Sequence, residues 1–133
     1  MSGNEFYVRV GSEIDVSRAV MQTKRCAQRW GFSAELATMI ATAASELARN
    51  IVKYAKEGEI IIRRVDDGAH EGLEIEARDR GPGIDDLDLA MQDHVSDGGT
   101  LGLGLPGVRR MMDVFQIQST PGEGTTVVAA KWL

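Results

Sequence analysis

Glu46, Asn50 and Lys53 share one edge of a predicted helix over residues 33–56. Glu46 and Asn50 are neighbours at i,i+4, and Lys53 follows Asn50 at i+3. An amide oxygen such as that of Asn50 can ligate Mg²⁺, and a carboxylate such as that of Glu46 can orient or deprotonate a hydroxyl group. A solvated helix flank with an ordinary Glu–Lys ion pair explains the same spacing. This helix alone leaves both interpretations open.

Asp79 stands at the end of a predicted strand, in phase with the inward-facing Leu73, Ile75 and Ala77. A carboxylate on a buried face needs partners, because burial without them is costly. The exocyclic amine of a purine could be such a partner. Alternatively, Asp79 caps the Gly-Pro-Gly turn at residues 81–83.

A glycine-rich segment at residues 98–107 leads into another predicted helix. Backbone N–H groups without side chains can face an anion, and a helix N-terminus adds positive potential. The segment lacks the Gly-Lys-Ser/Thr ending of a Walker A loop, and it does not open a βαβ unit near the N-terminus as a Rossmann fingerprint does. A second glycine pair, at residues 121–125, is typical of a hairpin turn.

Hydrophobic periodicity predicts the elements that must position these residues. Ser12 and Ser33 are the predicted N-caps of two long helices, and Gly31 ends the first of them. The predicted buried stripe of the second helix is Leu36, Ile40, Ala43, Leu47, Ile51 and Tyr54. Strands are predicted at residues 6–10, 59–65, 73–79, 116–120 and 125–132, a weak helix at 86–91, and a last helix from 105 onward.

The predicted order is strand, helix, helix, strand, strand, short helix, helix, strand, strand. Successive strands joined by tight turns favour an antiparallel or mixed sheet with helices on one face. The expected fold is therefore a two-layer α/β sandwich of the α+β class. No repeat or linker interrupts residues 1–133, so we expect a single domain.

Composition excludes several classes of function. The 133 residues carry 20 acidic side chains against 15 Lys plus Arg, a formal charge of −5, which argues against nucleic-acid binding. The single Cys26 excludes a disulfide framework and a multi-cysteine metal site, and we expect it in the core. No apolar run approaches the roughly 20 residues of a membrane span. A cytoplasmic protein without membrane association is the expectation.

Four motifs in a fixed order carry a family resemblance. They are Glu-x-x-x-Asn at 46–50, Asp-x-Gly-x-Gly at 79–83, the glycine-rich loop ahead of the last helix, and Gly-x-Gly-Thr at 122–125. Together they resemble the GHKL ATP-binding family, whose Bergerat fold is a two-layer sandwich, over residues 6–133. Within that family, residues 45–50, 101–110 and 131–133 are most similar to the serine/threonine switch kinases of the stressosome.

The resemblance implies a role for each matched position. Asn50 would ligate the Mg²⁺ ion that bridges the ATP phosphates, and Glu46 would be the base that accepts the proton of the substrate hydroxyl. Asp79 would hydrogen-bond the adenine amine with support from Thr125. The other implied ATP-binding positions are Gly81 and Gly83 beside the base, Gly102, Leu103, Gly104, Leu105 and Gly107 in a lid over the phosphates, and Lys53, together with Arg49, as further phosphate or substrate contacts.

One feature departs from the family. Many relatives place a basic side chain in the lid, whereas residues 92–107 contain no Lys or Arg, and His94 and Asp97 occupy the approach to it. The resemblance therefore leaves open which group neutralises the γ-phosphate.

The resemblance also implies a function and its partners. The expected activity is phosphorylation of Ser or Thr on STAS-domain scaffold or antagonist proteins, with ATP and Mg²⁺ as cofactors. Once released, such a kinase activates a PP2C-type phosphatase in a sigma-factor or second-messenger pathway. The alternatives are an anti-sigma kinase that binds a sigma factor, and a non-catalytic ATP-gated partner-switching module. The presence of both Glu46 and Asn50 favours catalysis over that module.

Overall fold

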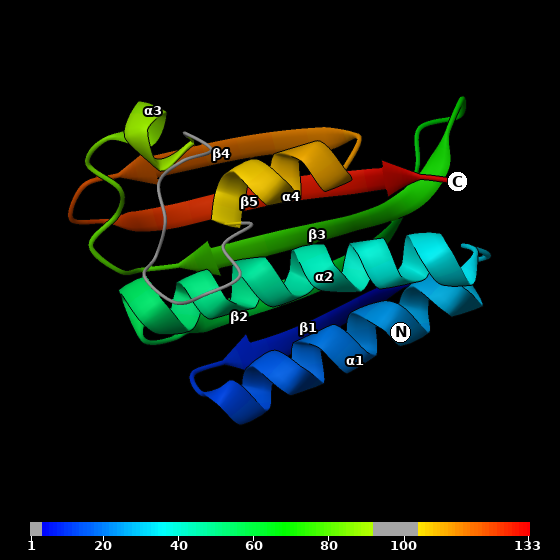
Figure 1. The fold of residues 1–133 in the computed structure, drawn as a ribbon, viewed down its shortest axis with the longest axis horizontal. Coiled ribbons are helices and arrows are strands. Elements are labelled where there is room, and N and C mark those ends of the chain that lie inside the picture. Colours follow the sequence, from blue (N-terminus) through cyan, green and yellow to red (C-terminus); the bar gives the residue numbers. More distant parts are fainter. Residues whose placement is uncertain (1–3, 92–103) are drawn as a thin grey trace.

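A computed structural model describes residues 4–91 and 104–133 of the chain (Figure 1). The order of strands and helices is the predicted one, with one insertion: a short π-helix, η1, follows the second long helix. The elements are β1 (Glu5–Val10), α1 (Glu13–Arg29), α2 (Ala34–Asn50), η1 (Ile51–Ala55), β2 (Gly58–Asp66), β3 (Glu71–Asp79), α3 (Leu87–Ala90), α4 (Gly104–Met111), β4 (Val114–Thr120) and β5 (Gly124–Trp132).

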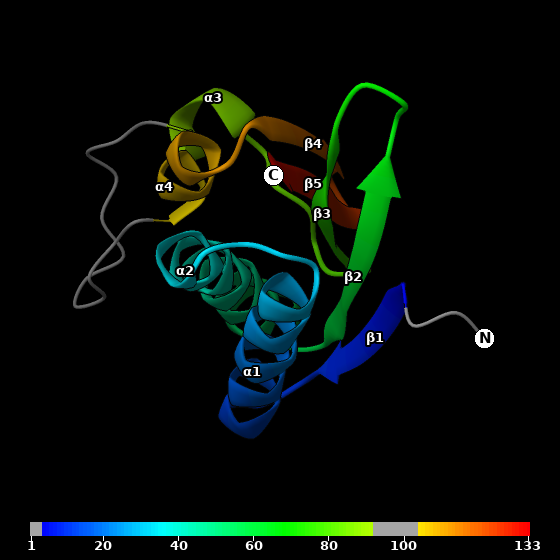
Figure 2. The same ribbon diagram turned by 90° about the vertical axis from the view of Figure 1, so that its right-hand side faces the viewer.

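The five strands form one sheet in the order β1-β2-β3-β5-β4, and all of its strand pairs are antiparallel. Helices α1, α2 and α4 cover one face of this sheet (Figure 2). The predicted α+β two-layer sandwich is confirmed, and the sheet is fully antiparallel rather than mixed. Two long helices separate β1 from β2, so the chain re-enters the sheet at the end where it left and pairs antiparallel with β1.

Helix α2 lies in the middle of the helical layer, between α1 and α4 (Figure 2). Its buried side combines Ile40 and Leu47 with five alanines, whose small side chains let α1, α4 and the sheet approach closely. The predicted N-caps are confirmed: the Ser12 and Ser33 hydroxyls accept the N–H groups of Asp15 at 3.4 Å and Leu36 at 3.2 Å. Cys26 lies in the core at 2% exposure, as expected, and burial raises the pKa of its thiol.

The prediction that Tyr54 belongs to the buried stripe of the second helix is wrong. The α-helix ends at Asn50, and residues 51–55 continue as the π-helix η1, whose i→i+5 turn is wider than an α-turn. The 3.6-residue period therefore stops at this point, and Tyr54 is turned outward with 54% of its surface exposed. Lys56 then adopts φ of +72°, which ends the helical segment.

The face of the sheet opposite the helices is held by an ion network around Arg63. Its guanidinium contacts Glu5 at 2.7 Å, Glu74 at 3.0 Å and Glu76 at 2.7 Å. Partial burial disfavours the charged guanidinium, but its hydrogen bonds outweigh this effect and raise the pKa of Arg63. The hydrogen bond from Arg63 in turn lowers the pKa of Glu5.

Among the described helices, none is long and apolar enough to cross a membrane.

Gly124, in the turn between β4 and β5, is required by close packing against the end of β3. Its φ is +131°, and a Cβ atom added there would lie 2.2 Å from the carbonyl oxygen of Asp79. Gly122 in the same turn also has positive φ, +83°, but an added Cβ would meet no atom within 4 Å.

We therefore expect Gly124→Ala to destabilise the fold by about 3 kcal/mol or more, because strain at positive φ adds to a steric clash. Gly122→Ala is the matched control and should cost only about 1 kcal/mol, since only its backbone is strained. Urea denaturation of both variants measures the difference. Equal losses of unfolding free energy in the two variants would show that the close contact with Asp79 does not add to the cost of the substitution.

Candidate functional site

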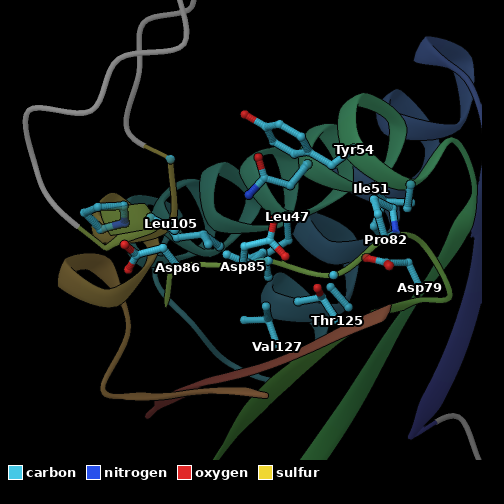
Figure 3. A pocket seen from close by; sticks show the side chains of 18 residues that line it. Leu47, Ile51, Tyr54, Asp79, Pro82, Asp85, Asp86, Leu105, Thr125 and Val127 are labelled. Atoms are coloured by element: carbon cyan, nitrogen blue, oxygen red, sulfur yellow. The ribbon is translucent and has the colours of Figure 1, made fainter. Parts of the chain in front are cut away.

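A cavity of about 430 Å³ opens between the helical layer and one end of the sheet (Figure 3). Residues of α2 and η1 form one wall, the start of α4 forms another, and β3 and β5 form the floor. The loop after β3 closes a third side. The lining is Leu47, Asn50, Ile51, Tyr54, Ala55, Ala77, Asp79, Pro82, Gly83, Ile84, Asp85, Asp86, Ala90, Gly104, Leu105, Pro106, Thr125 and Val127.

Asp79 is the last residue of β3 and lies at the floor of the cavity (Figure 3). Its Oδ1 atom accepts a hydrogen bond of 2.8 Å from the N–H of Gly81, so it caps the following turn. The carboxylate also lines the cavity, and the two roles suggested by the sequence are compatible because a carboxylate has two oxygens that can accept hydrogen bonds. Thr125 of β5 is the cross-strand partner of Asp79, so the two side chains enter the cavity together.

The two glycines after Asp79 pack against the protein itself. A Cβ atom on Gly81 would lie 2.6 Å from Cβ of Ala55, and Gly81 does not line the cavity. Gly83, with φ of +77°, lines it, but a Cβ there would lie 2.4 Å from the carbonyl oxygen of Thr120. Both glycines are therefore needed to seat the loop on η1 and on the β4–β5 turn, independently of any ligand.

Asn50 and Glu46 occupy the margin where α2 meets α4. Asn50 lines the cavity, whereas Glu46 lies just outside the lining, with Oε2 accepting a hydrogen bond of 3.1 Å from the N–H of Gly104. Glu46 thus caps the first residue of α4. Gly104 and Leu105 line the cavity, and Gly107 is buried within α4 outside it.

Four positions singled out in the glycine-rich segment and its approach lie outside the described residues. They are Gly102, Leu103, His94 and Asp97.

Two predicted basic contacts are not part of the cavity lining. Arg49 contacts Ser45 Oγ at 3.2 Å and Glu13 at 3.8 Å, on the α1 side of the helix. Lys53 is exposed, and its ammonium lies 5.3 Å from the centre of the Tyr54 ring. The π-helix begins directly after Asn50, so the i+3 alignment expected between Asn50 and Lys53 on a continuous α-helix does not apply.

Several residues of the site were missed by sequence reasoning. Tyr54 lines the helix side of the cavity because of η1, for which the sequence carries no periodic signal (Figure 3). Asp85 and Asp86 contribute carboxylates from the loop after β3. Ser119 lies outside the lining, as the cross-strand partner of Thr125. Its alternation with Phe115 and Ile117, which pack against the core, could have identified it.

The charge of the cavity is negative where the structure describes it. Its charged lining residues are Asp79, Asp85 and Asp86, and no Lys or Arg is among the described lining residues. At the start of α4 the N–H of Gly104 is donated to Glu46 and Pro106 has no N–H, so Leu105 and Gly107 supply the remaining backbone N–H groups on this margin. An anionic ligand placed here would need a cation to offset the carboxylates.

Comparison with known proteins agrees with this geometry. A family described as a histidine kinase-like ATPase domain matches residues 12–131. The chain is 47% identical over 126 residues to the serine/threonine-protein kinase RsbT of Bacillus subtilis (strain 168), covering 95% of both chains. It is also 33% identical over 98 residues to an anti-sigma F factor of Caldanaerobacter subterraneus subsp. tengcongensis, covering 71% of this chain and 68% of that protein.

A third relative, an anti-sigma F factor of Thermoanaerobacter sp. (strain X514), is 33% identical over 100 residues, with coverage of 71% and 68%. The GHKL resemblance drawn from the four motifs is thereby confirmed. The fold, the cavity between α2, α4 and β3, and these matches agree: the chain belongs to the histidine kinase-like ATPase family.

Proposed function

We propose that this chain is an ATP- and Mg²⁺-dependent protein serine/threonine kinase. The observation that carries the proposal is that one cavity collects Asp79 and Thr125 from the sheet, Asn50 from α2 and the N-terminus of α4. Asp79 and Thr125 can recognise a base, and Asn50 and the N-terminus of α4 can hold phosphates. The similarity to RsbT over 95% of both chains supports kinase activity.

Asp79 is proposed to accept a hydrogen bond from the exocyclic amine of adenine. Its Oδ1 already accepts the N–H of Gly81, and the second oxygen is available for a ligand donor. The apolar side chains of Ile51, Ile84 and Val127 line the same cavity and can contact the faces of the base.

Asn50 fits the role of a Mg²⁺ ligand. The described part of the chain has no cluster of three or more His, Cys, Asp or Glu that could hold a metal by itself. In phosphoryl-transfer sites Mg²⁺ commonly takes one or two protein oxygens and completes its shell with phosphates and water. Asn50 would hold the ion, which when bound would offset the phosphate charge beside Asp79, Asp85 and Asp86.

Glu46 is proposed as the general base for transfer. The hydroxyl oxygen of a substrate Ser or Thr forms a bond to the γ-phosphorus, the bond from that phosphorus to the β,γ-bridging oxygen breaks, and ADP leaves with the electron pair. Glu46 takes the hydroxyl proton. Its position supports this role because Oε2 lies 3.1 Å from the N–H of Gly104, at the margin where phosphates would meet α4.

The proposed substrates are STAS-domain scaffold or antagonist proteins, with activation of a PP2C-type phosphatase after release. The high identity to RsbT supports this branch of the family. A second candidate partner is a sigma factor, favoured by the 33% identity to two anti-sigma F factors. The two candidates share the cavity chemistry and differ in the protein that is bound.

A transfer assay tests the proposal. The chain is incubated with γ-labelled ATP, Mg²⁺ and a purified STAS-domain protein, beside the Glu46→Ala variant and beside a sample with EDTA. Label on Ser or Thr of the STAS protein is expected only with the wild-type chain and Mg²⁺. Nucleotide binding without transfer to any STAS protein would indicate a non-catalytic switching module, and capture of a purified sigma factor would indicate the anti-sigma branch. Absence of nucleotide binding would overturn the proposal.

A further inference from the structure

Lys131 occupies a core position of β5. It alternates with Val127 and Ala129, which are buried at 4% and 0% exposure on the face of the sheet that the helices cover. Its cross-strand partner in β3 is Leu73, which is fully buried, and only 15% of the Lys131 side chain is exposed. A lysine is rarely buried to this extent without a partner, because removing its ammonium from water is costly.

The ammonium of Lys131 binds the C-terminal end of α4. Its Nζ donates a hydrogen bond of 2.9 Å to the carbonyl oxygen of Met111, the last residue of that helix, and lies 3.6 Å from Oδ1 of Asp113. The last carbonyls of a helix have no partner within it and carry partial negative charge, so a cation placed there is stabilising. Lys131 thus ties α4 to the end of β5.

Side chains of opposite charge hold the two ends of α4. At the first residue Glu46 accepts the N–H of Gly104 at 3.1 Å, and at the last residue Lys131 binds the carbonyl of Met111. The helix has eight residues and is about 12 Å long at 1.5 Å per residue. Because so short a helix moves as one body, a shift of its last turn also displaces its first turn, which borders the cavity.

We propose that Lys131 is a positioning residue for the nucleotide phosphates: by holding the C-terminal end of α4, it fixes the first turn, whose backbone N–H groups would meet the phosphates. The inference rests on the proposed function, in which the phosphates lie at the start of α4. Without this hydrogen bond, bound phosphates would have to order the helix themselves, which would weaken their binding. Adenosine has no phosphates, so its affinity would not change.

The test compares ATP with adenosine as ligands of the full chain, by calorimetry with Mg²⁺ present. Lys131→Met keeps the apolar stem of the side chain and removes the ammonium. It is expected to weaken ATP binding roughly three- to tenfold, up to the value of one hydrogen bond from a charged group, and to leave adenosine affinity unchanged. Lys131→Arg retains a cationic donor and should restore the affinity for ATP.

Two control variants isolate the bond to α4. Asp113→Asn removes the ionic partner of Lys131, yet its amide oxygen can still accept the N–H of Trp132, which Asp113 Oδ2 accepts at 2.8 Å. Arg64→Met removes one positive charge from the same cross-strand row of the sheet, where Arg64 binds Glu71 at 3.1 Å instead of α4. Both controls should leave the ratio of ATP affinity to adenosine affinity unchanged.

Three results would overturn the inference. Equal losses of affinity for ATP and adenosine in Lys131→Met would show that Lys131 only stabilises the fold, and unchanged ATP affinity would show that α4 is placed without it. An equal fall of the ratio in Asp113→Asn would assign the effect to the ion pair. If Lys131→Met does not fold, Lys131→Gln, with a neutral donor on a shorter side chain, gives the same comparison. A wild-type chain that binds no ATP would contradict the proposed function itself.

Discussion

Glu46→Gln is expected to lower the rate of phosphoryl transfer by about 10²- to 10⁴-fold while ATP remains bound. Glutamine cannot accept the substrate proton, yet its amide oxygen can still accept the N–H of Gly104, which Glu46 Oε2 accepts at 3.1 Å. The variant thus removes the base and keeps the anchor of α4. It also removes a negative charge beside the proposed phosphate position, so ATP affinity should be equal to or greater than that of the wild-type chain.

Two companion variants separate the roles of this side chain. Glu46→Ala loses both the base and the contact with Gly104, so it should match Glu46→Gln in transfer and also show lower stability in urea. Glu35→Gln is the charge-matched control, because Glu35 is an exposed residue in the first turn of the same helix. Single-turnover transfer and calorimetry are the measurements. Transfer by Glu46→Gln at the wild-type rate would remove Glu46 from the mechanism.

Asp79→Asn is expected to weaken ATP binding by about 10- to 100-fold, the range for loss of a hydrogen bond to a charged group. In the wild-type chain the carboxylate accepts hydrogen bonds from two donors, the N–H of Gly81 at 2.8 Å and, in the proposed complex, the adenine amine. An amide has only one oxygen, so one of the two donors would face an NH₂ group. The loss should appear equally in ATP and ADP, because it concerns the base.

Asp66→Asn is a control of the same local chemistry. Asp66 also ends a strand, and its Oδ1 accepts the N–H of Gly68, two residues on, at 2.8 Å, but it does not line the cavity. Its substitution tests the cost of the turn cap alone and should leave nucleotide affinity unchanged. If both substitutions leave ATP affinity unchanged, Asp79 has no role in recognising the base.

The comparison of Tyr54 with Asp79 shows where sequence reasoning succeeds. Alternation with Leu73, Ile75 and Ala77 predicts the inner face for Asp79 correctly, because the alternation continues to the end of β3. The helical period predicts the wrong face for Tyr54, because the α-helix ends before η1. A local period predicts orientation only as long as the backbone keeps the conformation that defines the period.

The arrangement at Gly104 illustrates a second limit. Glu46 and Asn50 are one helical turn apart, so their proximity follows from α2 alone. The hydrogen bond from Gly104 to Glu46 joins residues 58 positions apart, and it depends on how α4 packs against α2. No spacing in the sequence encodes such a contact, because helix packing depends on the shapes of both surfaces.

The sequence by itself determined the α+β class, the order of the elements, the two serine caps and the motifs that resemble the GHKL family. These are properties of local periodicity, capping and residue identity, and they need no knowledge of distant contacts. Only the tertiary structure decided which candidates share a cavity: it brings Asn50, Asp79, Gly104 and Thr125 together and leaves Arg49 and Lys53 outside the lining. It also adds Tyr54 to the lining and places Ser119 behind Thr125, outside the lining. The physical reason is that the site forms where η1, α4 and the β4–β5 hairpin meet the end of β3, and those junctions are set by packing.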